Sequence, residues 1–279
     1  MRRRRDERLA PPRDPAAPSG PDATVVTGSG HHVDVWRRRA AASPQVDVAA
    51  LRDLVGEGAE LLIFSAHPDD ETIGAGRLLA AWRRSGARAA AVLATAGEAC
   101  VDHVGARPPG LVARRLAEWA AALAVLDVEP GETYGLPDSG LEDVQHSLDT
   151  AVATTLAATL AQGGPAGRLV LLAPHPLDPH PDHQAVGRAV AAAGARAGVP
   201  VWHFGVWLTY WGDPATDLGG RLVRVRAEEA DDRAWRDAVD CFESQTAPLA
   251  EGWGAVVPPE MLAHHDQQLL VLPAEGPAA

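Results

Sequence analysis

The chain has 279 residues and a formal net charge of −12, which suits one large domain and argues against a nucleic-acid partner, because a phosphate backbone binds basic surfaces. Two cysteines, Cys100 and Cys241, are too few for a disulfide framework and suit a reducing cytosol, so we expect a cytoplasmic protein. No apolar stretch approaches the length of a membrane span, and prolines follow the N-terminal arginine run where a signal peptide would have an apolar core.

The N-terminal segment differs in composition from the rest of the chain. Residues 1 to about 45 carry proline, glycine and charge without sustained periodicity. Such a composition predicts a disordered tail, here with one short ordered piece around residues 33–36. We expect a single domain over residues 46–275.

The remainder alternates short apolar runs with helical patterns. Residues 247 onward are rich in proline and are expected to form loops that cap one side of a site. Alternation of this kind indicates βαβ units. We therefore expect an α/β fold: a single Rossmann-like domain with a mostly parallel sheet flanked by helices. The predicted strands are 60–66, 88–95, 132–136, 168–173 and 200–209, and the predicted helices are 46–55, 73–85, 112–126, 148–160, 184–197 and 227–242.

A histidine and two carboxylates directly follow the first predicted strand. His67, Asp69 and Asp70 lie in a loop after the apolar run 61–64. Open α/β sheets bind ligands at the carboxyl ends of their strands. An imidazole and a carboxylate three residues apart can reach one divalent cation, which leaves the carboxylate between them free as a base. Taken alone, the cluster is equally compatible with a helix N-cap beside a surface histidine.

A second cluster follows the predicted strand 168–173. It contains His180 and His183, three residues apart, with further carboxylates between residues 174 and 183. His67, Asp70 and His183 together would supply two nitrogens and one oxygen. This ligand set suits a hydrolytic zinc ion that keeps an open position for water.

The remaining members of the two clusters suit acid–base chemistry. Asp69 would lie beside the metal-bound water and take its proton as general base. As an imidazolium, His180 would stabilise an oxyanion and later protonate a leaving amine. Asp182 would orient one of the histidines by accepting its hydrogen bond.

In this order, the motifs resemble the LmbE-like or PIG-L superfamily of zinc-dependent N-acetylglucosamine deacetylases. The two runs Ala66-His67-Pro68-Asp69-Asp70-Glu71 and His180-Pro181-Asp182-His183 carry the resemblance, which extends over residues 60–248. Shorter matches support it. They are Thr95-Ala96-Gly97-Glu98, Arg115 with Glu118, Asp138-Ser139-Gly140, and Ser244-Gln245.

The resemblance implies a role for each matching residue. It makes His67, Asp70 and His183 the zinc ligands and Asp69 the general base. It also implies that His180 stabilises the tetrahedral intermediate and that Arg115 and Asp138 contact the sugar.

The chain departs from the family pattern at two places. Some members have a tyrosine two residues before the histidine that matches His180, and this chain has Asp178 there. The family commonly has a lysine in the helix before Ser-Gln, where the nearest basic residues here are Arg233 and Arg236.

The predicted function is hydrolysis of an N-acetyl group from an N-acetylglucosamine-containing small molecule or glycoconjugate, with release of acetate and a free amine. The expected cofactor is Zn²⁺, and another divalent ion such as Fe²⁺ is also compatible. An amidase for another N-acyl or thiol-conjugate substrate is the alternative. A metal-dependent phosphoesterase is less favoured because it usually needs two metals and more carboxylates. The expected partner is the amino-sugar substrate, and a homo-oligomer is compatible with the sequence.

Overall fold

The computed structural model describes residues 30–102, 105, 108–163, 168–249 and 253–274. Within these ranges, no helix is long and apolar enough to cross a membrane. The elements in chain order are α1 (Asp34–Ala42), β1 (Gln45–Val46), α2 (Val48–Asp53), β2 (Glu60–Ser65), α3 (Asp70–Arg84), β3 (Ala89–Thr95), α4 (Leu111–Val125), β4 (Glu129–Leu136), α5 (Gln145–Gly163), β5 (Leu169–Pro174), α6 (Pro181–Ala197), β6 (Val201–Phe204), α7 (Leu208–Trp211), β7 (Arg221–Val225), α8 (Glu229–Val239), α9 (Glu243–Thr246), α10 (Pro259–Leu262), the 3₁₀ helix Ala263–His265 and β8 (Gln268–Leu272).

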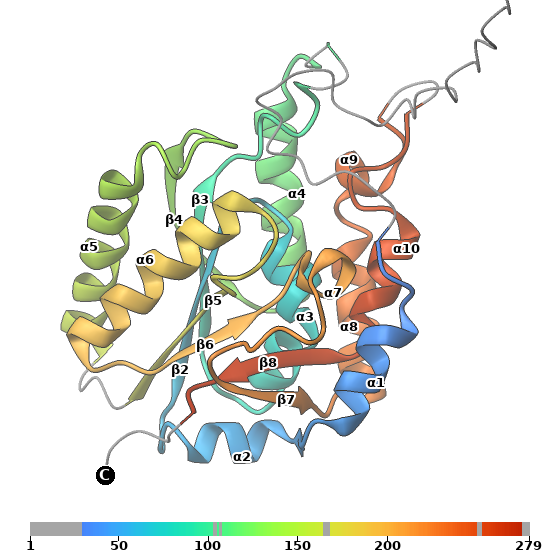
Figure 1. Cartoon of the computed structure of the whole chain (residues 1–279). Coiled ribbons are helices and arrows are strands. Elements are labelled where there is room, and N and C mark those ends of the chain that lie inside the picture. Colours follow the sequence, from blue (N-terminus) through green and yellow to red (C-terminus); the bar gives the residue numbers. More distant parts are fainter. Residues whose placement is uncertain (1–29, 103–104, 106–107, 164–167, 250–252, 275–279) are drawn as a thin grey trace, which may run out of the picture.

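The strands form one eight-stranded sheet in the order β1-β7-β8-β6-β5-β2-β3-β4 (Figure 1). Strand β2 lies between β3 and β5, parallel to both, and Ile63 is paired with Ala91 on one side and Leu172 on the other. Among the described strands, only β8 runs antiparallel to its two neighbours, β6 and β7. The predicted α/β fold with a mostly parallel sheet is confirmed.

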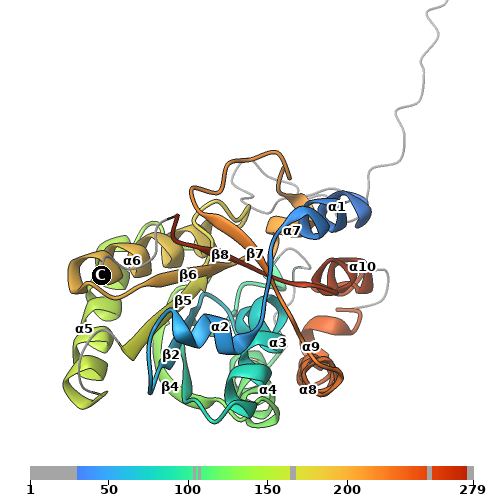
Figure 2. The same ribbon diagram turned by 90° about the horizontal axis from the view of Figure 1, so that it is seen from below.

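Helices cover both faces of the sheet. Figures 1 and 2 show α5 and α6 on one face and α3, α4 and α8 on the other. The core under the first layer includes Leu148 and Val190, and the core under the second includes Leu79, Trp82 and Leu123. Because both faces are covered, every residue of β2 from Leu61 to Ser65 is buried, which explains its continuous apolar run.

Helix α1 lies inside the segment that the sequence predicted to be a tail. It contains the short ordered piece expected around residues 33–36, and Trp36 is only 2% exposed. The Trp36 indole Nε1 donates to Gly212 O at 3.0 Å, and β1 pairs with β7. Ordered structure therefore begins before the expected boundary at about residue 45, while residues 1–29 lie outside the described part of the chain.

The predicted strand 200–209 is wrong in its second half. Strand β6 ends at Phe204, and the chain then turns and forms the short helix α7. The backbone N–H groups of residues 206–208 donate to a side-chain carboxylate, that of Asp178. These donors are therefore not available for a strand ladder.

The region after the predicted helix 227–242 also differs from the expectation. The helix ends at Val239, and α9 follows as a separate turn. Strands β7 and β8 were not predicted. Residues 268–272, expected to be loop, instead form a buried strand between β6 and β7.

Candidate active site

The turn between β2 and α3 is folded around the carboxylate of Asp70. Its Oδ2 accepts hydrogen bonds from the backbone N–H of Ala66 at 3.0 Å and of His67 at 2.8 Å. The preceding residue, Asp69, has φ 140°, a conformation that costs a non-glycine residue about 1–3 kcal/mol and is typical of functional sites. The local fold thus places one histidine and two carboxylates at the carboxyl end of β2.

Three donor atoms from the two predicted clusters meet at one point. His67 Nδ1 lies 3.3 Å from His183 Nε2, which in turn lies 3.1 Å from Asp70 Oδ1. His67 Nδ1 also lies 3.6 Å from the second oxygen of the same carboxylate, Asp70 Oδ2. Ligands at about 2.0–2.1 Å around a tetrahedral ion are separated by about 3.3 Å. These three side chains therefore fit one divalent metal ion.

The outward-facing nitrogens of both histidines are bound by carboxylates. His67 Nε2 lies 3.0 Å from Asp138 Oδ1 and 3.2 Å from Asp182 Oδ2. His183 Nδ1 lies 3.0 Å from Asp178 Oδ1. A carboxylate accepts a hydrogen bond from the nitrogen it contacts, so with a metal ion bound the opposite nitrogen of each ring would offer its lone pair. These opposite nitrogens, His67 Nδ1 and His183 Nε2, both face the carboxylate of Asp70.

His180 lies against the same centre. Its ring stacks on that of His183 with centroids 4.7 Å apart, and His67, His180 and His183 offer ligand atoms within 4.8 Å of one another. Burial is the largest cause that lowers the pKa of His180, to about 3, which favours the neutral ring. Since its Nδ1 accepts from the backbone N–H of Asp182 at 3.2 Å, the proton is on Nε2. The structure therefore favours a neutral donor over the expected imidazolium.

Arg115 is buried beside Asp69. One Nη donates to Gly97 O at 2.6 Å, and the other to Pro68 O at 3.0 Å and to Asp69 Oδ2 at 3.2 Å. Burial raises the pKa of Asp69 to about 7, and the positive charge of Arg115 opposes that rise. A carboxyl group that titrates near neutrality is suited to proton transfer. The residue expected to contact the sugar thus also binds the predicted base.

Asp138 connects two of the shorter motifs. Besides its contact with His67, it accepts from the backbone N–H of Ala99 at 2.7 Å, and its own N–H donates to Glu98 Oε1 at 3.1 Å. Asp182 behaves similarly, because its carboxylate accepts from the N–H groups of Ser139 and Leu141 at 2.7 and 3.1 Å. All eight predicted site residues therefore lie in one connected cluster at the carboxyl edge of the sheet.

Known proteins resemble this chain in sequence. A family model described as PIG-L, GlcNAc-PI de-N-acetylase, matches residues 62–194. A 1D-myo-inositol 2-acetamido-2-deoxy-alpha-D-glucopyranoside deacetylase of Mycobacterium sp. (strain KMS) is 33% identical, over 73% of this chain and 75% of the relative. The chain belongs to the PIG-L family. The family match runs from β2 into α6 and so includes both metal-site clusters.

Solved structures share the fold of this PIG-L protein. A deacetylase triple mutant from the teicoplanin biosynthetic pathway is 23% identical, with a TM-score of 0.55 over 67% of this chain and 83% of that one. A conserved protein from Thermus thermophilus is 24% identical, with a TM-score of 0.55 over 78% of this chain and 96% of that one. These similarities support the fold assignment.

One residue of this PIG-L protein's site was not predicted from the sequence. Asp178 is fully buried, and its carboxylate contacts His183. Its place within the second cluster, two residues before His180, was the available signal, but sequence spacing alone did not show which group it would meet. His175 in the same cluster is a loop residue that is buried, and its Nε2 donates to Leu218 O at 3.1 Å.

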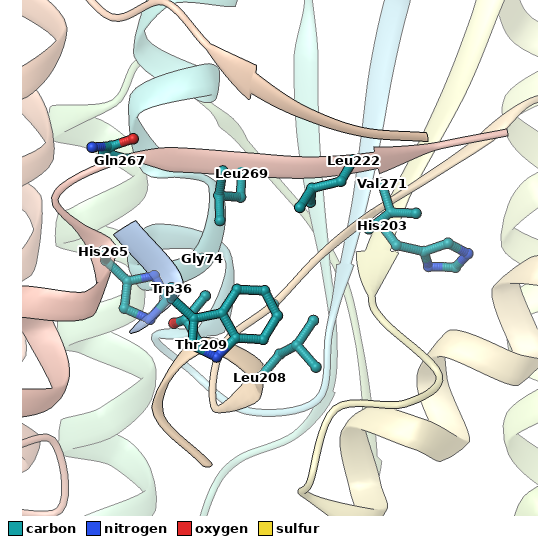
Figure 3. A pocket seen from close by; sticks show the side chains of 11 residues that line it. Trp36, Gly74, His203, Leu208, Thr209, Leu222, His265, Gln267, Leu269 and Val271 are labelled. Atoms are coloured by element: carbon teal, nitrogen blue, oxygen red, sulfur yellow. The ribbon is translucent and has the colours of Figure 1, made fainter. Parts of the chain in front are cut away.

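A small enclosed cavity of this PIG-L protein lies away from the cluster (Figure 3). Its volume of about 20 Å³ suits a single water molecule. Trp36, Leu208, Thr209 and His265 are among the residues that line it, and none of the predicted site residues does. The cavity is therefore separate from the candidate active site.

Proposed function

We propose that this PIG-L protein removes an N-acetyl group from an N-acetylglucosamine-containing small molecule or glycoconjugate. Family membership makes it a hydrolytic N-deacetylase. The mycobacterial relative acts on an acetamido sugar linked to inositol, as its name states, which supports an amino sugar as the substrate here. The observation that carries the proposal is the convergence of two imidazole lone pairs and Asp70 beside Asp69.

The proposed cofactor is Zn²⁺, held by His67, Asp70 and His183. Two nitrogens and one carboxylate oxygen are a ligand set that zinc accepts, and Fe²⁺ is compatible with the same atoms. When bound, the ion would lower the pKa of a water ligand to about 7 and polarise the substrate carbonyl.

Asp69 would transfer the proton in the reaction, and His180 would stabilise the negative charge that develops on the carbonyl oxygen. Asp69 takes a proton from the attacking water as the water oxygen bonds to the acetyl carbon, and it returns the proton to the amine as the C–N bond breaks. His180 Nε2–H donates to the carbonyl oxygen, on which negative charge develops. Acetate and the free amine leave. Arg115 holds Asp69 in place throughout.

The supporting carboxylates have a different task. Asp182 and Asp138 accept from His67 Nε2 and fix the ring orientation. We propose that Asp138 and Arg115 also contact sugar hydroxyls, because the carboxylate has further lone pairs and Arg115 Nε has no hydrogen-bond partner among the described residues. A cytoplasmic location is part of the proposal, based on the free thiols of Cys100 and Cys241.

The experiment is a primary-amine release assay on N-acetylglucosaminides that differ only in aglycone, with zinc-loaded protein. Asp69→Asn should keep its metal and lose about 10²–10⁴-fold in turnover, because only the base is removed. Asp127→Asn is a matched control. Asp127 also has a positive φ and an arginine partner, Arg83, but it lies on the surface and should leave turnover unchanged.

Three outcomes would count against the proposal. Parental turnover by Asp69→Asn would refute its role as base. Amine release only from other acyl amides would favour the amidase alternative. Phosphate release from a generic ester, without amine release, would favour a phosphoesterase.

A further inference from the structure

The carboxylate of Asp178 joins two parts of the molecule that are distant in sequence. Its Oδ1 lies 3.0 Å from His183 Nδ1. Its Oδ2 accepts three backbone N–H groups, from Val206 at 2.9 Å and from Trp207 and Leu208 at 3.0 Å each. Both side chains of the Asp178–His183 pair are completely buried. A single carboxylate therefore connects a candidate metal ligand to the segment after β6.

The hydrogen-bond roles around Asp178 are fixed by what each partner can do. The three N–H groups can only donate, so Oδ2 must accept. The backbone N–H of His180 also donates to Oδ1, at 3.2 Å. An ionised carboxylate has no proton to give, so His183 Nδ1 must be the donor. The imidazole then carries a proton on Nδ1, and with a metal ion bound it would present the lone pair of Nε2, the atom that faces Asp70.

The two candidate histidine ligands differ in the number of carboxylates that hold the ring nitrogen facing away from the metal site. His67 Nε2 has two carboxylate partners, Asp138 and Asp182. His183 Nδ1 has a single carboxylate partner among the described residues, Asp178. The loss of one acceptor should therefore affect His183 more than His67.

We propose that Asp178 is a positioning residue that fixes the metal-binding tautomer of His183 and anchors the segment 206–208 to the metal centre. The inference rests on the proposed role of His183 as a ligand. The same segment is held from its other side, because His265 Nε2 donates to Val206 O at 2.9 Å. Figure 3 shows Leu208 and His265 lining the same cavity. The anchor for His183 is thus itself packed into the body of the fold.

Asp178→Asn tests the tautomer with almost no change of shape. The amide has one oxygen, and the three N–H groups of residues 206–208 require it. The NH₂ group must then face the backbone N–H of His180, which loses its acceptor, and His183 Nδ1, which can accept a hydrogen bond only if the ring proton moves to Nε2. His183 would lose the lone pair that points at the metal. We expect affinity for Zn²⁺ to fall about 10–100-fold.

The measurement is a competition titration of metal-free protein with Zn²⁺ and a chromophoric chelator, which does not depend on turnover. Asp213→Asn is the matched control, since Asp213 Oδ1 accepts the N–H of Ala215 at 2.8 Å in an exposed turn and an amide oxygen can do the same. It should bind Zn²⁺ within twofold of the parent. Equal Zn²⁺ affinity in Asp178→Asn and the parent would overturn the inference.

A second measurement does not require the variant to fold. ¹⁵N NMR of the histidine side chains in the zinc-loaded parent should show His183 protonated at Nδ1 and unprotonated at Nε2. A proton on Nε2 would overturn the inference. His183→Ala separates this result from the metal-site assignment. If that variant binds Zn²⁺ as tightly as the parent, the metal-centre assignment is wrong and the inference falls with it. If it loses Zn²⁺ while Asp178→Asn retains it, only the role of Asp178 is refuted.

Discussion

Replacement of Arg115 by methionine should destabilise the fold and shift the pH dependence of turnover. The Arg115 side chain is 3% exposed and that of Asp69 is 8% exposed, so their ion pair is almost fully buried. Loss of one partner leaves a buried carboxylate uncompensated, which costs about 3–5 kcal/mol. The carbonyl groups of Gly97 and Pro68 lose their donors as well. We expect the free energy of unfolding to fall by about that amount.

The pH effect follows from the charge of Arg115. Burial raises the pKa of Asp69 to about 7, and Arg115 is the largest influence that lowers it. An opposite charge at this distance moves a carboxyl pKa by about 1–3 units. In Arg115→Met the pKa of Asp69 should therefore rise further. A base works only when ionised, so the acid limb of kcat/KM should move to higher pH by about 1–3 units.

Arg114→Met is the control, because Arg114 is the neighbouring residue on α4 but is half exposed. Its ion pair with Glu243 lies on the surface, where such pairs contribute about 0–1 kcal/mol. Glu118, its other partner, is only 11% exposed and keeps its hydrogen bonds from Ser244 N and Oγ in the variant. Denaturant unfolding and the pH profile of amine release would be measured for both variants. If Arg115→Met matched Arg114→Met in both, the reasoning about a buried pair would be refuted. A rise in KM without a shift of the acid limb would indicate that Arg115 acts on the substrate and not on Asp69.

Two further predictions concern the support of the site and the fold. Gly97→Ala should reproduce the pH shift of Arg115→Met, because a Cβ at Gly97 would collide with the Arg115 guanidinium. Gly86→Ala is the control, since Gly86 also has a positive φ but lies beside open space. It should lower stability without shifting the pH profile. An unchanged acid limb in Gly97→Ala would contradict this. Burial lowers the pKa of His265 to about 4, below its unfolded value of about 6.5, so protons bind the unfolded chain first. Stability should be full above about pH 6.5 and fall by about 3 kcal/mol between pH 6.5 and 4, and His265→Gln should reduce that fall in denaturant titrations at both pH values.

The local sequence predicted the central strands of the sheet, because successive residues of these strands are all buried. The apolar runs at 61–64 and 168–173 are buried on both faces, so their composition alone identifies central strands. The motifs that follow them lie at strand ends, and parallel strands bring those ends together. For this reason the sequence alone predicts that His67, Asp70 and His183 lie close together.

Other features depend on partners that sequence spacing does not reveal. The apolar run Leu269-Leu270-Val271-Leu272 of β8 is itself a strand signal, but its antiparallel place between β6 and β7 depends on tertiary contacts. The role of Asp178 depends on N–H groups 28 to 30 positions later in the chain. Likewise, the contact between Arg115 and Asp69 requires the close approach of α4 to Gly97. Each of these is a tertiary interaction, which local sequence propensity does not predict.

The place of β8 in the sheet has a consequence for biosynthesis. Strands β1 and β7 pair with each other and reach the rest of the sheet through β8, whose residues 268–272 are made long after residues 45–46. As a nascent chain emerges at about 5–20 residues per second, β2 to β6 can pair in order, but β1 has no partner sheet to join until β8 arrives. The eight-stranded sheet can therefore be completed only after residues 268–272 have emerged, and a nascent chain stalled before residue 268 should have a half-formed sheet and an exposed β6 edge.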